Sequence, residues 1–274
     1  MNRALVLGGG GVTGIAWHLG ILGGLQRAGV PLGDADTIIG TSAGSVVGTL
    51  VAAGVDLETA IAEQLVEAPA AQPRSGGGGG WLAAMAVLAD PSVPAQEARA
   101  RVGVMALQAA TVDEETYLSR MRPLLPADGW PERDLRITVV DTADGRDLTL
   151  GPGSGASLLQ AIAASCAVPG LMPPVTIDGR RYMDGGVRVG AAADLAAGAD
   201  RLVVLAPLAV LGRERIVAEM AASGAAGTLL IEPDPAALEA IGPNVMDPAR
   251  RPAAVRAGLR QAEELAPLVR KTWG

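Results

Sequence analysis

The sequence predicts an α/β fold with a mainly parallel central sheet, and the strongest support for this lies near its start. Short apolar runs at Ala4–Leu7 and Thr37–Gly40 are typical of strands that are buried on both faces. A glycine turn and a helical segment follow each run, at Gly14–Ala28 and Ala43–Ala53. A strand, a turn and a helix repeated in this order are the pattern of an α/β protein.

The rest of the chain contains fewer strands and one long helical region. Residues 56–126 are Ala-rich, and we interpret them as a helical insertion over the sheet, with Arg74–Gly80 as a mobile glycine loop. The other expected elements are a hairpin of Arg136–Thr142 and Asp147–Gly151, a helix at Ala156–Ala164, a hairpin within Val175–Gly186, strands at Arg201–Pro207 and Gly227–Pro233, and a helix at Pro252–Arg270. No linker divides the chain, so we expect a single domain over residues 1–274.

Composition and charge exclude several classes of protein. The net charge is −7 and Lys and Arg form no block, which argues against a nucleic-acid partner. The longest apolar run, Trp81–Ala89, has nine residues, whereas a membrane span needs about 20. The N-terminus is interpreted as a strand and not as a secretion signal. The single cysteine, Cys166, fits a reducing compartment, so we expect a cytoplasmic protein.

The glycine loop GGGGVTG, Gly8–Gly14, has two functional interpretations. Gly9, Gly11 and Gly14 match the dinucleotide-binding pattern G-x-G-x-x-G, and Asp34 lies 20 residues further on. That acid precedes the second strand, however, whereas a ribose-binding acid should follow it. In the other interpretation, backbone N–H groups at the helix N-terminus bind the oxyanion of an acyl-transfer reaction. A purely structural turn is the third alternative.

The stretch GTSAG, Gly40–Gly44, matches the nucleophile elbow G-x-S-x-G. It follows a short apolar strand and precedes a helix, which is the position that this motif requires. The small flanking residues allow the strained turn that exposes Ser42 Oγ. The alternative is that Ser42 only caps the second helix.

A serine nucleophile needs a proton acceptor, and this chain offers few. The one histidine, His18, precedes the serine on an Ala/Leu-rich helix, where we expect it to pack and not to act as a base. The one lysine, Lys271, lies near the end of the sequence. Among carboxylates, Asp184 in MDGG has the best context, because it follows a hairpin and two glycines permit close approach of the backbone. Burial near Oγ would raise its pKa toward that of a general base; an ordinary turn is the alternative.

The motifs GGGGVTG, GTSAG and DGG, in this order and on these elements, resemble those of patatin-like phospholipases, the bacterial branch of the patatin and cytosolic phospholipase A2 group. The segment Ala161–Val175 is also similar to the family's segment between nucleophile and Asp, and the resemblance covers residues 4–207. It implies a three-layer α/β/α fold and hydrolysis of lipid acyl esters. It also implies a Ser–Asp dyad that works without a cofactor.

The resemblance assigns a role to each motif residue. Ser42 would be the nucleophile, and Asp184 would be the base and then the acid. The backbone N–H groups of Gly9, Gly10 and Gly11 would form the oxyanion hole. The supporting glycines of the three motifs would be Gly14, Gly40, Gly44, Gly185 and Gly186.

Two positions depart from the family pattern. Thr13 stands in the glycine loop where the family usually has Arg or Lys, so a cation near the oxyanion or a lipid phosphate is missing. After the DGG motif, Val189–Asp194 replaces a more polar segment that often contains Asn. The departure at Thr13 concerns the preference for phospholipids more than the chemistry.

The sequence therefore favours a lipid acyl hydrolase of the phospholipase A, lysophospholipase or carboxylesterase type. We expect a lipid or acyl-ester substrate and transient contact with a membrane surface. Trp81 in the helical insertion is a candidate for acyl-chain contact or a lid, with core packing as the alternative. The competing hypotheses are an NAD(P)-binding oxidoreductase and a catalytically degenerate lipid-binding relative. Acyl chain length, head group and oligomeric state do not follow from the sequence.

Overall fold

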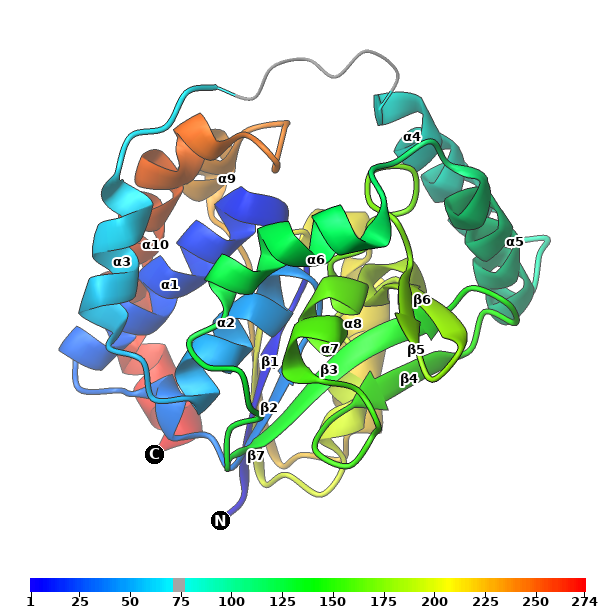
Figure 1. The fold of residues 1–274 in the computed structure, drawn as a ribbon. Helices are drawn as coiled ribbons and strands as arrows, with labels where there is room; N and C mark the ends of the chain where they lie inside the picture. The colour runs from blue at the N-terminus through cyan, green and yellow to red at the C-terminus, as the bar shows by residue number, and fades with distance from the viewer. Residues whose placement is uncertain (71–76) are drawn as a thin grey trace. The chain divides into compact units, whose positions relative to one another are not determined.

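The computed structural model describes residues 1–70 and 77–274, which divide into two compact units (Figure 1). Unit 1 consists of Met1–Gln72, Pro131–Leu135 and Gly190–Gly274. Unit 2 consists of Pro73–Trp130 and Arg136–Val189. Both units are discontinuous in sequence, and the single domain expected over residues 1–274 stays a prediction.

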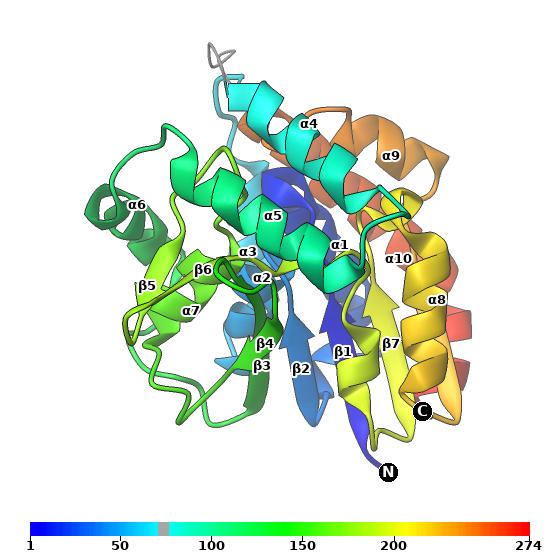
Figure 2. The same ribbon diagram turned by 90° about the vertical axis from the view of Figure 1, so that its right-hand side faces the viewer.

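Unit 1 contains a parallel sheet with the strand order β2-β1-β7-β8. Figure 2 shows β2, β1 and β7 side by side. Its strands are β1 (Arg3–Leu7), β2 (Thr37–Gly40), β7 (Arg201–Leu205) and β8 (Gly227–Ile231). Leu5, Val6 and Leu7 are fully buried, as expected for a strand covered on both faces. The four strands confirm the predicted α/β class and the parallel part of the sheet.

Helices cover both faces of this sheet. They are α1 (Gly11–Arg27), α2 (Ala43–Ala52), α3 (Leu57–Leu65), α8 (Arg213–Ala222), α9 (Pro235–Ile241) and α10 (Arg251–Trp273). On one face, Val6 and Val204 belong to an apolar cluster with Ile216 of α8. Side chains of a strand alternate between faces, and on the other face Gly48 of α2 lies against Ile38 and Leu7. Unit 1 thus has the three layers that the family resemblance implies. Helices α8 and α9 were not predicted from the sequence.

Helices α1 and α10 pack in direct backbone contact because both carry glycines. A Cβ added to Gly258 of α10 would lie 2.6 Å from Trp17 O and 3.0 Å from Gly20 Cα of α1. Trp17 Nε1 also donates a hydrogen bond to Gln261 Oε1 at 3.1 Å across the same interface. The first and last helices of the described chain are therefore held together by close backbone packing and by a buried hydrogen bond.

Unit 2 contains antiparallel strands in the order β5-β6-β3-β4. They are β3 (Asp134–Asp141, whose first two residues belong to unit 1), β4 (Asp147–Leu150), β5 (Val175–Ile177) and β6 (Arg180–Asp184). Its helices are α4 (Gly77–Leu88), α5 (Ala95–Gln108), α6 (Glu114–Met121) and α7 (Leu158–Ser165). Both hairpins expected from the sequence are confirmed, and α4 and α5 pack on Val140 and Met183.

The glycine loop predicted at Arg74–Gly80 can be compared with the structure only at Gly77–Gly80. Residues 74–76 lie outside the described residues, whereas Gly77–Gly80 form the first turn of α4, so the loop prediction is wrong there. Glycine costs about 1 kcal/mol per residue in a helix. At Gly80 an added Cβ would lie 3.1 Å from Gly170 Cα, a tight contact that glycine avoids. Trp81, next in the helix, is half-buried.

Within residues 1–70 and 77–274, no helix is both long and apolar enough to span a bilayer.

The glycine contact between α1 and α10 predicts a large stability effect. Gly258→Ala should lower the free energy of unfolding by about 2 kcal/mol or more, because its methyl group has no room beside Trp17 O. Gly129→Ala is the matched control, since a Cβ at Gly129 meets no atom within 4 Å. Urea unfolding followed by circular dichroism measures both variants. Equal midpoints for the two variants would contradict this packing.

Candidate active site

The turn between β2 and α2 holds Ser42 in a strained backbone conformation. Its φ is 52° and its ψ is −119°, a region that residues other than glycine rarely adopt. Thr41 N–H donates to Leu7 O at 2.9 Å, and Gly44 N–H donates to Thr41 O at 2.8 Å. These bonds fix the turn against the end of β1. The geometry is that of a nucleophile elbow, as the motif predicts.

The two glycines of the elbow are required by close backbone contacts. A Cβ at Gly44 would overlap the carbonyl group of Leu7, and one at Gly40 would crowd the backbone of Gly44 and Ser45. Ser42 occupies the N-cap position of α2, yet its side chain makes no capping hydrogen bond to the helix. The capping alternative for Ser42 therefore has no support in the hydrogen bonds of α2.

The glycine loop leads from β1 into α1, which begins at Gly11. Gly8 N–H donates to Leu205 O at 2.9 Å, and Gly11 has a φ of 60°. Within the described part of the chain, no hydrogen bond occupies the N–H groups of Gly9, Gly10 and Gly11. Unpaired N–H groups at the positive end of a helix can bind an anion.

The structure brings this loop next to the serine. A Cβ at Gly9 would lie 3.6 Å from Ser42 Cβ. A Cβ at Gly14 would lie 3.7 Å from Ala43 Cβ, so α1 and α2 approach closely at their first turns. A Cβ at Gly10 would lie 2.8 Å from Gly14 Cα, which explains why position 10 is glycine. The loop can therefore present N–H groups beside a nucleophile at Ser42.

The acid proposed for dinucleotide binding is in the wrong place. Asp34 belongs to the 3₁₀ helix η1 (Leu32–Asp34), ahead of β2, and its carbonyl accepts a hydrogen bond from Arg3 Nη2 at 3.2 Å. Strand β2 ends at Gly40, so the elbow takes the position where a ribose-binding acid should lie.

His18 is fully buried in α1. Its Nε2 lies 3.3 Å from Leu205 O, and because a carbonyl only accepts, this nitrogen carries the proton. Burial lowers the pKa of His18 to about 4, so the ring is neutral near pH 7. Leu205 O also accepts the N–H of Gly8. His18 therefore supports the end of β7 from within the core, in agreement with the packing role expected for it.

Asp184 ends β6 in unit 2 and is 5% exposed. Its N–H donates to Ala167 O at 3.0 Å, and its Oδ1 accepts the N–H of Gly186 at 2.7 Å. A Cβ at Gly185 would crowd the side chain and backbone of Thr138. Gly186 thus helps to orient the carboxylate, and Gly185 allows the backbone to approach Thr138 closely. Ser42 belongs to unit 1, so the pairing of Ser42 with Asp184 stays a prediction.

Thr13 has a structural partner that the sequence did not reveal. It is fully buried, and both its N–H and its Oγ1 bond to Val245 O, at 3.1 and 3.3 Å. Gly11 lies against Val245 and Met246. These contacts join segments more than 200 residues apart, and no motif in residues 242–247 indicated them.

The segment after the DGG motif is supported by a buried acid. Glu219 of α8 is 3% exposed, and its Oε2 accepts the N–H groups of Ala191 and Ala193 at 2.9 and 3.3 Å. In this chain a carboxylate from a distant helix therefore orders the backbone of a segment that has no polar side chain before Asp194.

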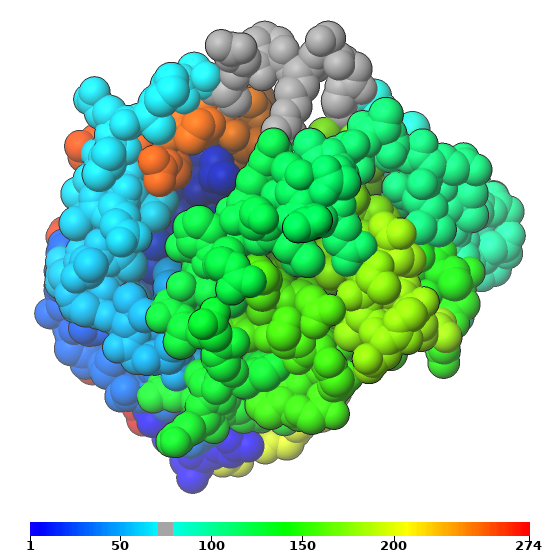
Figure 3. All heavy atoms as spheres, in the orientation of Figure 1, coloured from blue at the N-terminus to red at the C-terminus, as the bar shows by residue number. Residues whose placement is uncertain are grey.

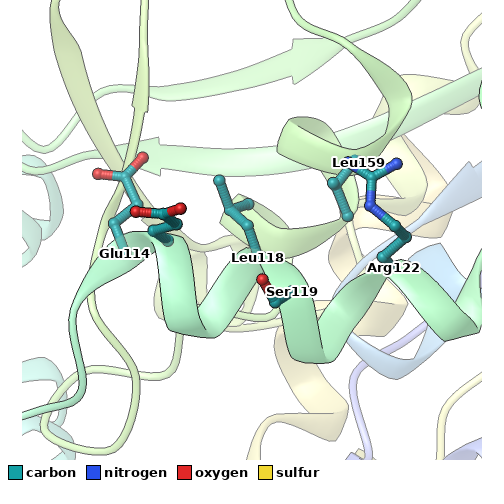
Figure 4. Close-up of a pocket in the computed structure, with 6 residues that line it drawn as sticks. Glu114, Leu118, Ser119, Arg122 and Leu159 are labelled. Atoms are coloured by element: carbon teal, nitrogen blue, oxygen red, sulfur yellow. The ribbon is translucent and has the colours of Figure 1, made fainter.

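A shallow pocket of about 490 Å³ lies on unit 2, over α6 (Figure 4). Helix α6 lies on the face of the molecule that Figure 3 shows. The residues lining the pocket are Glu114, Glu115, Leu118, Ser119, Arg122 and Leu159. None of the residues singled out from the sequence lines it, so it gives no support to the predicted site. The described residues also contain no cluster of His, Cys, Asp and Glu suited to a metal ion.

Residues 5–196 match the family model described as patatin-like phospholipase. The chain belongs to this family. The match spans well over half of the chain and includes the glycine loop, the elbow and the DGG motif. The family predicted from the three motifs is therefore confirmed.

Curated proteins of known name show more limited similarity. A stretch of 53 residues, 19% of this chain, is 51% identical to lysophospholipase NTE1 of Coccidioides immitis (strain RS) and covers 3% of that protein. Lysophospholipase nte1 of Aspergillus fumigatus matches to the same extent. This patatin-like chain therefore aligns with only a small part of the length of these curated relatives.

Two solved structures are also similar in part. VipD from Legionella pneumophila has a TM-score of 0.47 and 16% identity, over 97% of this chain and 67% of that chain. The type III effector protein ExoU has a TM-score of 0.40 and 16% identity, over 96% of this chain and 53% of that chain.

The buried His18 predicts a pH dependence of stability. The folded protein keeps the ring neutral down to about pH 4, whereas the unfolded chain binds a proton near pH 6.5. The unfolded state therefore binds more protons in this window, and stability falls as the pH decreases. We expect His18 alone to lower the free energy of unfolding by about 2 kcal/mol between pH 7 and pH 5.

Urea unfolding at both pH values checks this, with His18→Gln as the comparison because its side chain does not titrate. The variant should lose this part of the pH dependence, because the carboxylates contribute equally to the pH dependence of both proteins. The same difference between the two pH values in both proteins would contradict a depressed pKa for His18.

Proposed function

We propose that this patatin-like protein is a lipid acyl hydrolase that cleaves a carboxylic ester through an acyl-enzyme on Ser42. The observation that carries the proposal is the strained elbow beside a glycine loop. Ser42 has a φ of 52°, and the neighbouring loop has three N–H groups for which the described residues provide no partner. A nucleophile and an anion-binding loop side by side suit acyl transfer.

The proposed reaction has two halves. Ser42 Oγ attacks the ester carbonyl carbon while Asp184 takes the hydroxyl proton, and the resulting oxyanion accepts hydrogen bonds from the N–H groups of Gly9, Gly10 and Gly11. The tetrahedral intermediate then expels the alcohol, which receives the proton from Asp184. Water attacks the acyl-enzyme in the same manner, Asp184 again carries the proton, and the acid leaves with Ser42 restored.

Asp184 is the proposed base because its environment orients a carboxylate. It is nearly buried, and its Oδ1 accepts the N–H of Gly186 at 2.7 Å, which fixes the orientation of the carboxylate. Fixed orientation by a neighbouring N–H is what a general base needs to reach a serine hydroxyl. The buried neutral His18 is already bonded to Leu205 O and has no part in this scheme.

We also propose a lipid substrate that is reached by transient contact with a membrane surface, in a cytoplasmic protein. The helical region 56–126, including the half-buried Trp81, is the proposed contact with the acyl chain or a lid.

Substitution of the proposed dyad tests the function. Ser42→Ala and Asp184→Asn should each lower kcat/KM for a p-nitrophenyl acyl ester by at least about 10³-fold, since each removes a group that acts in the transition state. Asp178→Asn is the matched control, because Asp178 is an exposed carboxylate in the hairpin turn before β6. His18→Gln should retain most of the activity.

The same variants separate this proposal from its alternatives. Loss of activity in His18→Gln with activity retained in Asp184→Asn would reverse the assignment of the base. A catalytically degenerate relative would fail to react with a fluorophosphonate probe, whereas the proposed enzyme is labelled at Ser42 and the label is lost in Ser42→Ala. Saturable micromolar binding of NADPH would instead favour the oxidoreductase.

A further inference from the structure

The segment that follows α9, residues 242–247, lies against the beginning of α1 (Figures 1 and 3). Val245 O accepts hydrogen bonds from both Thr13 N–H and Thr13 Oγ1. Thr13 is fully buried, so these bonds form away from solvent, where an unpaired partner would be costly. One buried threonine therefore fixes the segment to the first turn of α1. We call residues 242–247 the clamp turn.

The clamp turn also has hydrogen bonds of its own. Asn244 Oδ1 accepts the N–H of Met246 at 3.2 Å, and Asn244 O accepts the N–H of Asp247 at 3.0 Å. Asp247 Oδ1 then accepts the N–H of Ala249 at 3.1 Å. Such asparagine and aspartate turns hold a short loop in a defined conformation. The turn is therefore a built structure that presents its side chains in fixed positions.

Two apolar side chains of the clamp turn lie directly on the glycine loop. A Cβ at Gly11 would lie 2.9 Å from Val245 Cγ2 and 3.0 Å from Met246 Sδ. Both residues are only half-buried, so each keeps apolar surface open to solvent beside the loop. Gly11 is one of the three residues whose N–H groups are proposed to bind the oxyanion.

We propose that Val245 and Met246 form one wall of the acyl site and make the enzyme prefer esters with an aliphatic, uncharged group at that position. This inference rests on the proposed function. If the glycine loop binds the carbonyl oxygen of the ester, the groups attached to the carbonyl carbon begin within a few bonds of Gly11. An aliphatic chain gains free energy by covering half-buried Val and Met side chains.

A charged substrate group would lose water beside these apolar side chains without gaining a hydrogen bond from them. The charged side chain within residues 242–247 is the carboxylate of Asp247, and the guanidinium of Arg250 lies against Gly242. Arg250 donates through Nη1 to Glu239 O at 3.0 Å. Residues 242–247 also lie beyond the family match, which ends at residue 196, so the match does not describe this wall. Thr13 is a positioning residue for this wall, because its two hydrogen bonds hold the backbone of Val245.

Chain-length selectivity tests the wall. In the wild type, kcat/KM for p-nitrophenyl octanoate should exceed that for p-nitrophenyl acetate. Met246→Ala should lower this ratio about fivefold, because the octanoyl chain loses apolar contact while the acetyl group does not. Met246→Leu should keep the ratio, as should Leu268→Ala, an exposed apolar control on α10.

The positioning role of Thr13 has its own pair of variants. Thr13→Val removes the bond from Oγ1 to Val245 O, and it should raise KM for the octanoate ester while leaving kcat for the acetate ester within about twofold. Thr13→Ser retains the hydroxyl and should restore the wild-type KM. A merely structural role would lower both parameters with both esters, in proportion to the loss of folded protein.

Charge selectivity tests the second part of the proposal. Mono(p-nitrophenyl) succinate should react at least about tenfold more slowly than p-nitrophenyl butanoate, because its carboxylate would lose water against the apolar wall. Equal rates for these two esters in the wild type would overturn the preference for an uncharged group.

The outcomes separate this inference from the proposed function. Hydrolysis that depends on Ser42 but keeps the same octanoate-to-acetate ratio in Met246→Ala would overturn the wall alone. A wild-type protein that hydrolyses neither ester and is not labelled by a fluorophosphonate would overturn both.

Discussion

The approach of α2 to the end of β1 is the contact on which the proposed site depends. Gly44 lies so close to the carbonyl group of Leu7 that no side chain fits, and the same carbonyl accepts the N–H of Thr41 at 2.9 Å. These two contacts fix the turn before α2, and α2 itself, against the end of β1. Ser42, between these two anchors, adopts a positive φ of 52°. The strain is sustained by the surrounding packing and not by Ser42 itself.

The glycine loop is held on three sides by different parts of unit 1. Gly9 faces Ser42, Gly10 lies against Pro207 after β7, and Gly11 lies against the clamp turn. Leu205 O at the end of β7 receives both the N–H of Gly8 and the proton of His18. An anion-binding loop built from glycines is intrinsically pliable, so these supports are what would keep its N–H groups aimed at one point.

Local signals explain which predictions succeeded. Strands β1 and β2, helices α1 and α2 and both hairpins were predicted because each follows from a short apolar run and its adjoining turn. The family followed from three motifs in a fixed order, and the match over residues 5–196 confirms it. Predictions failed where packing overrides propensity. Gly77–Gly80 form a helical turn although glycine disfavours helices, and no sequence rule signals the close contact of Gly80 with Gly170.

By itself, the sequence determined the order of strands and helices in the first part of unit 1, the motif residues and the expectation that His18 is not the base. Those features depend on residues that are neighbours in the chain. Only the tertiary structure decided that Thr13 bonds to Val245, that Met246 lies on Gly11 and that Glu219 orders the segment after the DGG motif. Each of these contacts joins residues far apart in sequence. Their partners are chosen by the packing of helices on the sheet, which no local pattern specifies.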